Sequence, residues 1–296
     1  MPEVVEICIV SHYLITYIKN KYITNIETNG GRYKNGIPNI DILLNVLPLK
    51  ITNIDSKGKL LWFELLNEKT NEIFIILNTF GLTGIWTFNK LKNSNVLFEI
   101  NNETNIYFDD QLHYGTFKIT NKKGLTKKLN ELGDDLLKTP FSDLDFLKKI
   151  NSLKNKNKKI IDVLMEQKKN GLGSGLGNYL VAEILYNAKI SPHRKMIDLL
   201  TEDIFVLSNT IKYILKLCYN TCTIGYFGNF IEYIPIHKKQ IEKGIFPDFH
   251  IDIKIKKNDE FKFCVYRQNI DPFGNKIKKE KILNLRNFYW VENIQK

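Results

Sequence analysis

The sequence is poor in the residues from which disulfide scaffolds and metal sites are built. It has four cysteines among 296 residues, and no two of them form a C-x-x-C pair. The five histidines likewise form no H-x-x-x-H pair. Such a chain predicts neither a disulfide framework nor a zinc cluster, and its cysteine usage is typical of a reducing compartment. We therefore expect no metal site. The cysteines are Cys8, Cys218, Cys222 and Cys264.

Long apolar runs are also missing, and so is a basic stretch at the amino terminus. A membrane-spanning helix needs about 20 consecutive apolar residues, and no part of this sequence approaches that length. The start Met-Pro-Glu lacks the positive region of a signal peptide. We expect a protein without membrane contacts that is intracellular, in the nucleus or the cytoplasm, and is not secreted.

Acidic residues are fewer than basic ones, 32 against 43, which leaves a formal net charge of +11. This excess favours a polyanionic partner such as nucleic acid. A basic solvated surface is the alternative, because the abundance of Lys, Asn and Ile is typical of AT-rich coding sequence. The hydrophobic content of 43% is typical of a globular protein. At 296 residues, the chain is long enough for two domains with cores of their own.

Residues 171–177 form a glycine-rich turn, Gly-Leu-Gly-Ser-Gly-Leu-Gly, that leads into the apolar-periodic segment 178–186. Glycines permit close backbone approach, and the N–H groups of a helix start attract an anion such as phosphate. The carboxamide of Asn178 adds a donor there. A flexible linker before a core helix is the alternative. A dinucleotide-binding fingerprint is excluded, because no offset gives G-x-G-x-x-G and residues 160–167 have helical periodicity.

Met1 is followed by Pro2 and Glu3, and Glu6 lies three residues after Glu3. Methionine is normally removed before a small residue such as proline, which leaves Pro2 with a free secondary amine. An α-amino group titrates near about 8, far below a lysine, so much of it is an uncharged nucleophile near neutral pH. Proline and acidic residues also suit the first turn of a helix, so a well-capped terminal helix opening at these residues is the alternative.

Between roughly residues 20 and 120, short apolar runs separated by Asn and Gly predict a β-sandwich. Helices are predicted at 160–167 and 175–187 and after the caps Ser142 and Thr201, and a further strand at 263–268. The strands predicted for the sandwich are 60–66, 73–77, 85–88, 96–100, 106–108 and 116–119.

Five short motifs are informative when they are taken together. In chain order they are the Pro2-Glu3 start, the hairpin lysine Lys59, the loops Gly81-Leu82-Thr83-Gly84 and Asp110-Gln111-Leu112-His113-Tyr114-Gly115, the Gly-Leu-Gly-Asn178-Tyr-Leu turn, and Arg286-Asn-Phe-Tyr-Trp. They resemble, in the same order, the formamidopyrimidine-DNA glycosylase / endonuclease VIII (Fpg/Nei) family. The resemblance is strongest to its endonuclease VIII-like members with a zincless finger.

This resemblance implies an α+β fold of two domains. Residues 1–121 would form an N-terminal catalytic β-sandwich with an N-terminal helix. Residues 122–296 would form a helix–two-turn–helix domain (122–248) that ends in a zincless-finger β-hairpin (249–296). In most members four cysteines hold the finger around zinc, whereas none of the corresponding positions here is a cysteine. A packed hairpin would then replace the metal.

The resemblance also implies catalytic roles for four residues. Pro2 would be the Schiff-base nucleophile and Glu3 the general acid and base. Glu6 matches a second acidic position of the family. Lys59 would contact phosphate and assist the chemistry.

Two further groups of residues would hold the DNA. The backbone of the damaged strand would be bound by Asn178, Arg286, Gly175, Gly177 and Lys59. The gap left by a flipped nucleotide would be filled by Leu82, Leu112 and Tyr114. Leu112 and His113 stand where two arginines are usual in the family, so the family's contacts to the opposite base are not expected in the same form.

The implied function is a bifunctional DNA glycosylase and AP lyase of base excision repair. It would remove oxidised bases, pyrimidines favoured, through a Pro2 Schiff base and β,δ-elimination, and it would need no cofactor or metal. Its partner would be double-stranded DNA with oxidised bases or abasic sites, with single-stranded DNA as a further substrate, and it would act as a monomer. A pocket loop within 222–246 would set lesion specificity. The alternatives are a catalytically silent protein that binds damaged DNA, and an RNA-binding protein with a related helix–two-turn–helix.

Overall fold

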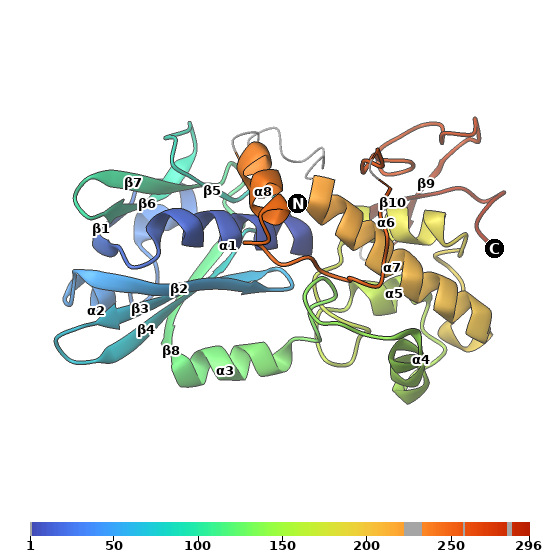
Figure 1. Ribbon diagram of the computed structural model, residues 1–296, viewed down its shortest axis with the longest axis horizontal. Coiled ribbons are helices and arrows are strands. Elements are labelled where there is room, and N and C mark those ends of the chain that lie inside the picture. The colour runs from blue at the N-terminus through green and yellow to red at the C-terminus, as the bar shows by residue number, and fades with distance from the viewer. Residues whose placement is uncertain (1, 222–232, 257, 283–285) are drawn as a thin grey trace. The chain divides into compact units, whose positions relative to one another are not determined.

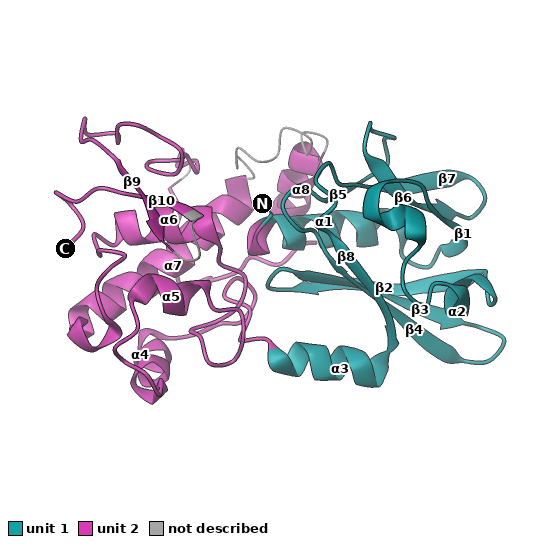
Figure 2. Cartoon of the chain, turned by 180° about the vertical axis from the view of Figure 1, so that it is seen from behind, with its two compact units in different colours: residues 1–2, 6–131 teal, residues 3–5, 132–296 magenta. Residues whose placement is uncertain are grey.

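The computed structural model describes residues 2–221, 233–256, 258–282 and 286–296, the last range without the side chain of Arg286. The chain forms two compact units, which Figure 2 shows in different colours. The first comprises residues 1–2 and 6–131, and the second comprises residues 3–5 and 132–296. None of the helices in the described residues is long and apolar enough to cross a membrane.

The first unit is a β-structure with one long helix at its start and one at its end (Figure 1). All six predicted strands of this region are present, and two more precede them. The elements are α1 (Val4–Ile18), β1 (Tyr22–Thr28), η1 (Gly31–Asn35), α2 (Asp41–Leu44), β2 (Leu49–Lys57), β3 (Leu60–Asn67), β4 (Glu72–Thr79), β5 (Ile85–Thr87), β6 (Ser94–Ile100), β7 (Thr104–Asp109), β8 (Thr116–Asn121) and α3 (Lys122–Glu131).

The strands form one antiparallel ladder in the order β5-β7-β6-β1-β2-β3-β4-β8 that folds on itself as a sandwich. Strands β1 and β2 pair over only two positions, and the register of both strands shifts beside that junction. The core between the layers is aromatic: the ring of Phe63 on β3 lies 5.6 Å from Phe98 on β6 and 5.3 Å from Trp86 on β5. The predicted β-sandwich is therefore confirmed.

The helix predicted at the start of the chain is present as α1, but it begins at Val4, so Pro2 and Glu3 precede it. Its side chains are buried on nearly every side, which explains why an apolar sequence without an amphipathic pattern is helical here. Because Glu3 precedes the helix, its side chain does not lie along α1. Its carboxylate instead contacts the start of α6 in the second unit.

Helix α3 follows β8 directly and packs on β4 and β8 of the first unit. The compact units divide at Glu131–Leu132, after this helix. The boundary predicted at residues 121 and 122 falls at the junction of β8 and α3. As a division into separately folding domains, it stays a prediction.

The second unit is mainly helical and ends in a two-stranded antiparallel hairpin (Figure 1). Ser142 is the predicted cap of its first helix: its hydroxyl accepts from the backbone N–H of Asp145, and the Asp145 carboxylate closes the capping box. The fold class is that expected. The elements are α4 (Asp143–Ser152), α5 (Ile160–Met165), α6 (Asn178–Asn187), η2 (Met196–Asp198), α7 (Thr201–Thr221), α8 (Tyr233–Glu242), β9 (Lys278–Ile282) and β10 (Arg286–Trp290).

The strand predicted at 263–268 is wrong, because this segment is irregular. Its backbone N–H groups have another acceptor: the buried carboxylate of Glu183 on α6 accepts from Cys264, Val265 and Tyr266 at 2.8–3.0 Å. Burial raises the pKa of the Glu183 carboxyl, and the three hydrogen bonds oppose that shift. The Glu183 carboxylate thus accepts the backbone hydrogen bonds that a neighbouring strand would otherwise accept.

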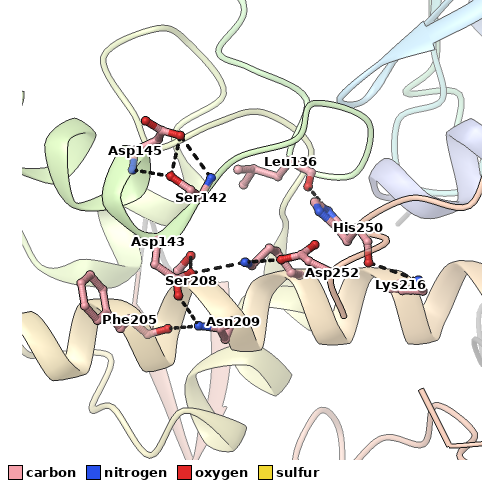
Figure 3. Close-up of polar contacts among 11 residues, drawn as sticks. Leu136, Ser142, Asp143, Asp145, Phe205, Ser208, Asn209, Lys216, His250 and Asp252 are labelled. Atoms are coloured by element: carbon pink, nitrogen blue, oxygen red, sulfur yellow. Dashed lines mark hydrogen bonds and ion pairs between the residues drawn. The ribbon is translucent and has the colours of Figure 1, made fainter. Parts of the chain in front are cut away.

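Two lysines of α7, Lys212 and Lys216, are buried, whereas the carboxylates that pair with them are partly exposed. Figure 3 shows the polar contacts around them. The ammonium of Lys212 lies 2.8 Å from Asp252 and 3.3 Å from Asp143, and Lys216 donates to the carbonyl of His250 at 3.1 Å. The hydrogen bond from Lys212 lowers the pKa of the Asp252 carboxyl. These contacts fasten the segment that follows α8 onto α7 and onto the start of α4.

Helix α8 is fixed to α7 through a buried histidine, and this predicts a pH-dependent stability. The Nε2–H of His237 donates to the carbonyl of Tyr219 at 3.0 Å, and burial lowers the pKa of His237 from 6.5 to about 4. Between those values the unfolded chain binds a proton that the native chain does not, so stability falls as the pH falls. At 1.36 kcal/mol per pKa unit, the full loss is about 3 kcal/mol.

We therefore expect His237→Gln to remove part of the pH dependence of unfolding. In urea titrations at a series of pH values, the difference in unfolding free energy between wild type and variant should shrink by about 3 kcal/mol between about pH 7 and about pH 4. A difference that stays constant over this range would contradict a neutral His237 in the native state.

Candidate active site at the glycine turn and the chain start

The carboxylate of Glu3 occupies the start of α6. Its two oxygens accept from the backbone N–H of Gly177 at 2.5 Å and of Tyr179 at 3.1 Å, and its side chain is buried. A helix start offers unpaired N–H groups and the positive end of the dipole, so a carboxylate is a suitable partner. The sequence indicated that this turn attracts an anion. The anion in this structure is the chain's own Glu3 rather than a phosphate.

The glycines of the turn allow the first residues of the chain to lie directly against it. Gly175 has a φ of 114°, and a Cβ built there would lie 2.4 Å from the Cβ of Val4. The backbone N–H of Val4 donates to the carbonyl of Gly175 at 3.0 Å. Any side chain at position 175 would therefore displace the segment that contains Glu3. The backbone N–H of Gly177, two residues later, donates to the Glu3 carboxylate.

Gln167 holds the same turn through three hydrogen bonds, a role that the sequence did not indicate. Its amide nitrogen donates to the carbonyls of Met165 and Leu176, both at 2.8 Å, while its oxygen accepts from the N–H of Gly175 at 2.8 Å. One side chain thereby connects the end of α5 to both halves of the turn. A single glutamine after an apolar helix carries no distinctive pattern, so only its position before a glycine run could have indicated this role.

Asn178 joins the turn to the C-terminal hairpin. Its side-chain amide donates to the backbone carbonyl of Asn287 on β10 at 2.9 Å. Asn287 pairs with Lys281 of β9 and follows Arg286, which pairs with Ile282. The backbone of Arg286 therefore lies in β10 one residue from the Asn178 contact, while its side chain lies outside the described part of the chain. The structure brings together two of the predicted DNA-binding positions.

Hydrogen bonds to the Asp271 carboxylate hold the segment that leads into the hairpin. The carboxylate of Asp271 accepts from the hydroxyl of Tyr186 at 2.9 Å and from the backbone N–H groups of Phe273 and Asn275. Burial raises the pKa of the Cys264 thiol to about 11, so the cysteine of this region is a poor source of thiolate. Among the residues that the structure describes, no three His, Cys, Asp or Glu side chains lie together as ligands of a zinc site would.

The remaining predicted site residues belong to the first unit. Lys59 is half-buried in the two-residue turn between β2 and β3, after Gly58 with a φ of 57°. Leu82, Leu112 and Tyr114 are exposed on the loops before β5 and after β7. Glu6 is fully buried within α1.

The loop predicted to set lesion specificity, 222–246, lies partly outside the described residues. Positions 222–232 are not described, and the described remainder forms α8 and the turn after it.

Three family models match the sequence. They are the N-terminal domain of formamidopyrimidine-DNA glycosylase over residues 1–117, its H2TH domain over 132–225 and its C-terminal domain over 251–296. Together they span both compact units, and the middle model contains the turn that holds Glu3.

Relatives and solved structures agree with these matches. The formamidopyrimidine-DNA glycosylase of Wolbachia sp. subsp. Brugia malayi (strain TRS) is 31% identical over 221 residues, 72% of this chain and 76% of that protein. The Mycoplasma genitalium protein of the same name is 26% identical over 258 residues, 81% and 86% of the two chains. A structure of Lactococcus lactis formamidopyrimidine-DNA glycosylase bound to DNA with an AP site has a TM-score of 0.71 at 19% identity, with 99% of both chains covered.

A sandwich unit and a helix–two-turn–helix unit with a terminal hairpin define the fold of a DNA glycosylase. A MutM complex with DNA containing carbocyclic 8-oxo-G also shares it, with a TM-score of 0.74 at 19% identity over the whole of both chains. The present chain belongs to the formamidopyrimidine-DNA glycosylase family and is an Fpg-type DNA glycosylase of base excision repair.

Proposed function

We propose that this glycosylase is bifunctional and also cleaves the DNA strand as an AP lyase. The observation that carries the proposal is the position of Glu3, which is fixed by two backbone N–H groups at the start of α6 and is covalently next to Pro2. A terminal secondary amine beside an oriented carboxylate has the parts needed for covalent catalysis with proton transfer.

In the proposed reaction, the amine of Pro2 attacks C1′ of the damaged nucleotide. Glu3 assists protonation of the sugar ring oxygen, and the base departs. The resulting iminium joins enzyme to DNA and acidifies the C2′ protons. Loss of such a proton expels the 3′ phosphate by β-elimination, and δ-elimination then releases the 5′ phosphate. Hydrolysis of the remaining iminium then releases the unsaturated sugar fragment as an aldehyde, so the products are a gapped strand with phosphate ends, this fragment and the free enzyme.

The proposed partner is a DNA duplex that contains a damaged base or an abasic site, with single-stranded DNA as a second substrate, bound by a monomer. Asn178, Arg286 and Lys59 would hold the backbone of the damaged strand, because the side-chain amide, guanidinium and ammonium groups donate well to phosphate. Gly175 and Gly177 would contribute through shape, since their contacts fix the N-terminal segment. Glu6 would support the chemistry from α1.

For the damaged base, we propose oxidised pyrimidines as the favoured substrates. The hairpin lacks cysteines at the positions where most family members hold zinc, as in the endonuclease VIII-like members, and this supports the preference. Ring-opened purines are the second candidate, and the names of the relatives reported above favour them.

A glycosylase assay tests both the activity and the substrate. The mature protein is expected to release thymine glycol from duplex oligonucleotides faster than 8-oxoguanine or a formamidopyrimidine. Faster release of the formamidopyrimidine would overturn the pyrimidine preference and leave the glycosylase assignment intact. Binding without release of any base would favour a silent damaged-DNA-binding protein. Tighter binding to structured RNA than to the damaged duplex would favour an RNA-binding role.

A further inference from the structure

One buried carboxylate connects the two loops that carry the exposed apolar side chains. Asp110 follows β7 and is fully buried. Its Oδ1 accepts from the hydroxyl of Thr83 at 2.6 Å, and its Oδ2 accepts from the hydroxyl of Tyr33 at 2.9 Å and from the N–H of Gly115 at 2.7 Å. The donors come from three separate segments, so this single side chain fixes the arrangement of all three. Hydrogen bonds to an ionised acceptor are among the stronger ones in proteins.

The two loops are also in direct contact. The hydroxyl of Thr83 donates to Asp110 and accepts from the backbone N–H of Leu112 at 3.0 Å. Gly81 has a φ of 62°, and a Cβ built there would lie 2.5 Å from the carbonyl carbon of Tyr114. The segments 80–84 and 110–115 therefore pack against each other as one rigid body, and a side chain at position 81 would not fit between them.

This body presents aliphatic and aromatic surface to the solvent. The exposed fractions are 40% for Leu82, 48% for Leu112 and 57% for Tyr114. The imidazole of His113 is instead packed against the ring of Tyr33, with centroids 6.2 Å apart and an edge-on geometry. His113 is thus turned toward Tyr33, whereas Leu112 and Tyr114 of the same loop, together with the polar Gln111, are exposed.

We propose that Asp110 is a positioning residue that fixes Leu82, Leu112 and Tyr114 as a single preformed wedge for the stacked bases of a duplex. The inference rests on the proposed function and on the role implied by the family resemblance, in which these three side chains fill the gap behind a flipped nucleotide. Apolar side chains that enter between base steps must overcome the stacking energy of the duplex. A wedge that is already ordered loses little conformational entropy on insertion, whereas two independent loops would lose more.

Thr83 offers the sharpest test, because it is neither a wedge side chain nor a proposed catalytic group. Thr83→Val keeps the shape but removes both the donor to Asp110 and the acceptor for Leu112. Thr83→Ser keeps the hydroxyl. Thr52→Val is the matched control, since it removes a hydroxyl bond to the carbonyl of Glu64 on another part of the same unit.

The first measurement is single-turnover base release from a lesion-containing duplex. Thr83→Val is expected to slow it roughly tenfold, the equivalent of one charge-assisted hydrogen bond, with Thr83→Ser and Thr52→Val near wild type. The second is borohydride trapping on a single-stranded abasic oligonucleotide, which has no base stack to open and should be unaffected. The third is 2-aminopurine fluorescence beside a tetrahydrofuran site in a duplex, whose rise on binding should be smaller for Thr83→Val.

Equal slowing of Thr83→Val on duplex and single-stranded substrates, or wild-type behaviour on both, would overturn the positioning role. Tyr33→Phe, which removes a different donor to Asp110, is expected to reproduce the duplex-selective loss and guards against a folding defect of one variant. Wild-type protein that gives no trapped adduct on either substrate would count against the proposed lyase instead. In that case the fluorescence rise, which needs no chemistry, still decides whether Asp110 positions the wedge.

Discussion

Borohydride is expected to trap the mature protein on an abasic duplex through Pro2, and a chain with one extra residue ahead of Pro2 is expected to give only background adduct. The extension keeps every side chain of the protein but converts the Pro2 nitrogen into an amide, which has no basic lone pair for attack on C1′. Pro2→Ala retains a primary α-amine and is expected to give a reduced yield. Denaturing electrophoresis of the covalent complex measures all three.

The pH dependence of trapping separates the chain terminus from a lysine. An α-amino group with a pKa of about 8 is substantially uncharged near neutral pH, whereas a lysine with a pKa of about 10.4 is not. Adduct formation should therefore rise with pH through a midpoint near about pH 8 and level off near about pH 9. An undiminished adduct in the extended chain, or a rise that continues to pH 10, would show that a lysine such as Lys59 is the nucleophile.

The sequence could predict the sandwich because its strands have local signals. Apolar runs separated by Asn and Gly recur from Leu60 to Asn121, and each run became a strand. The two strands before them, β1 and β2, were missed, because polar residues interrupt both and β1 pairs with β2 over only two positions. Strand β1 pairs mainly with β6, which lies about 70 residues later in the chain, and β2 pairs mainly with β3, which follows it directly.

Two of the buried carboxylates whose contacts escaped prediction act over long sequence distances. Asp110 joins Tyr33 and Thr83, and Glu183 holds the backbone of residues 264–266. A carboxylate that accepts several backbone or hydroxyl donors has no signature in the sequence, since its partners need no particular side chains. The glycine turn was located from its composition, but the identity of its anion depended on where Glu3 lies after the chain folds.

Glu3→Gln is expected to reduce release of an intact damaged base by roughly a hundredfold or more, the usual contribution of a positioned acid or base. The amide is nearly the same size as the carboxylate but cannot transfer a proton in the same way. It also cannot accept from both Gly177 and Tyr179, because its NH₂ group would face one of these N–H donors. The loss therefore combines chemistry with a disturbed position of the Pro2 amine.

The two contributions separate when the base is already absent. An abasic site needs no help with base departure, so Glu3→Gln should retain much more of its trapping yield there than of its excision rate. Glu183→Gln is the matched control, because Glu183 is an equally buried carboxylate of the same unit that also accepts backbone N–H groups. It is expected to lower thermal stability and to reduce excision and trapping in equal proportion. An equal loss of both activities in Glu3→Gln would mean that Glu3 only holds the chain start against α6, and that another group assists departure of the base.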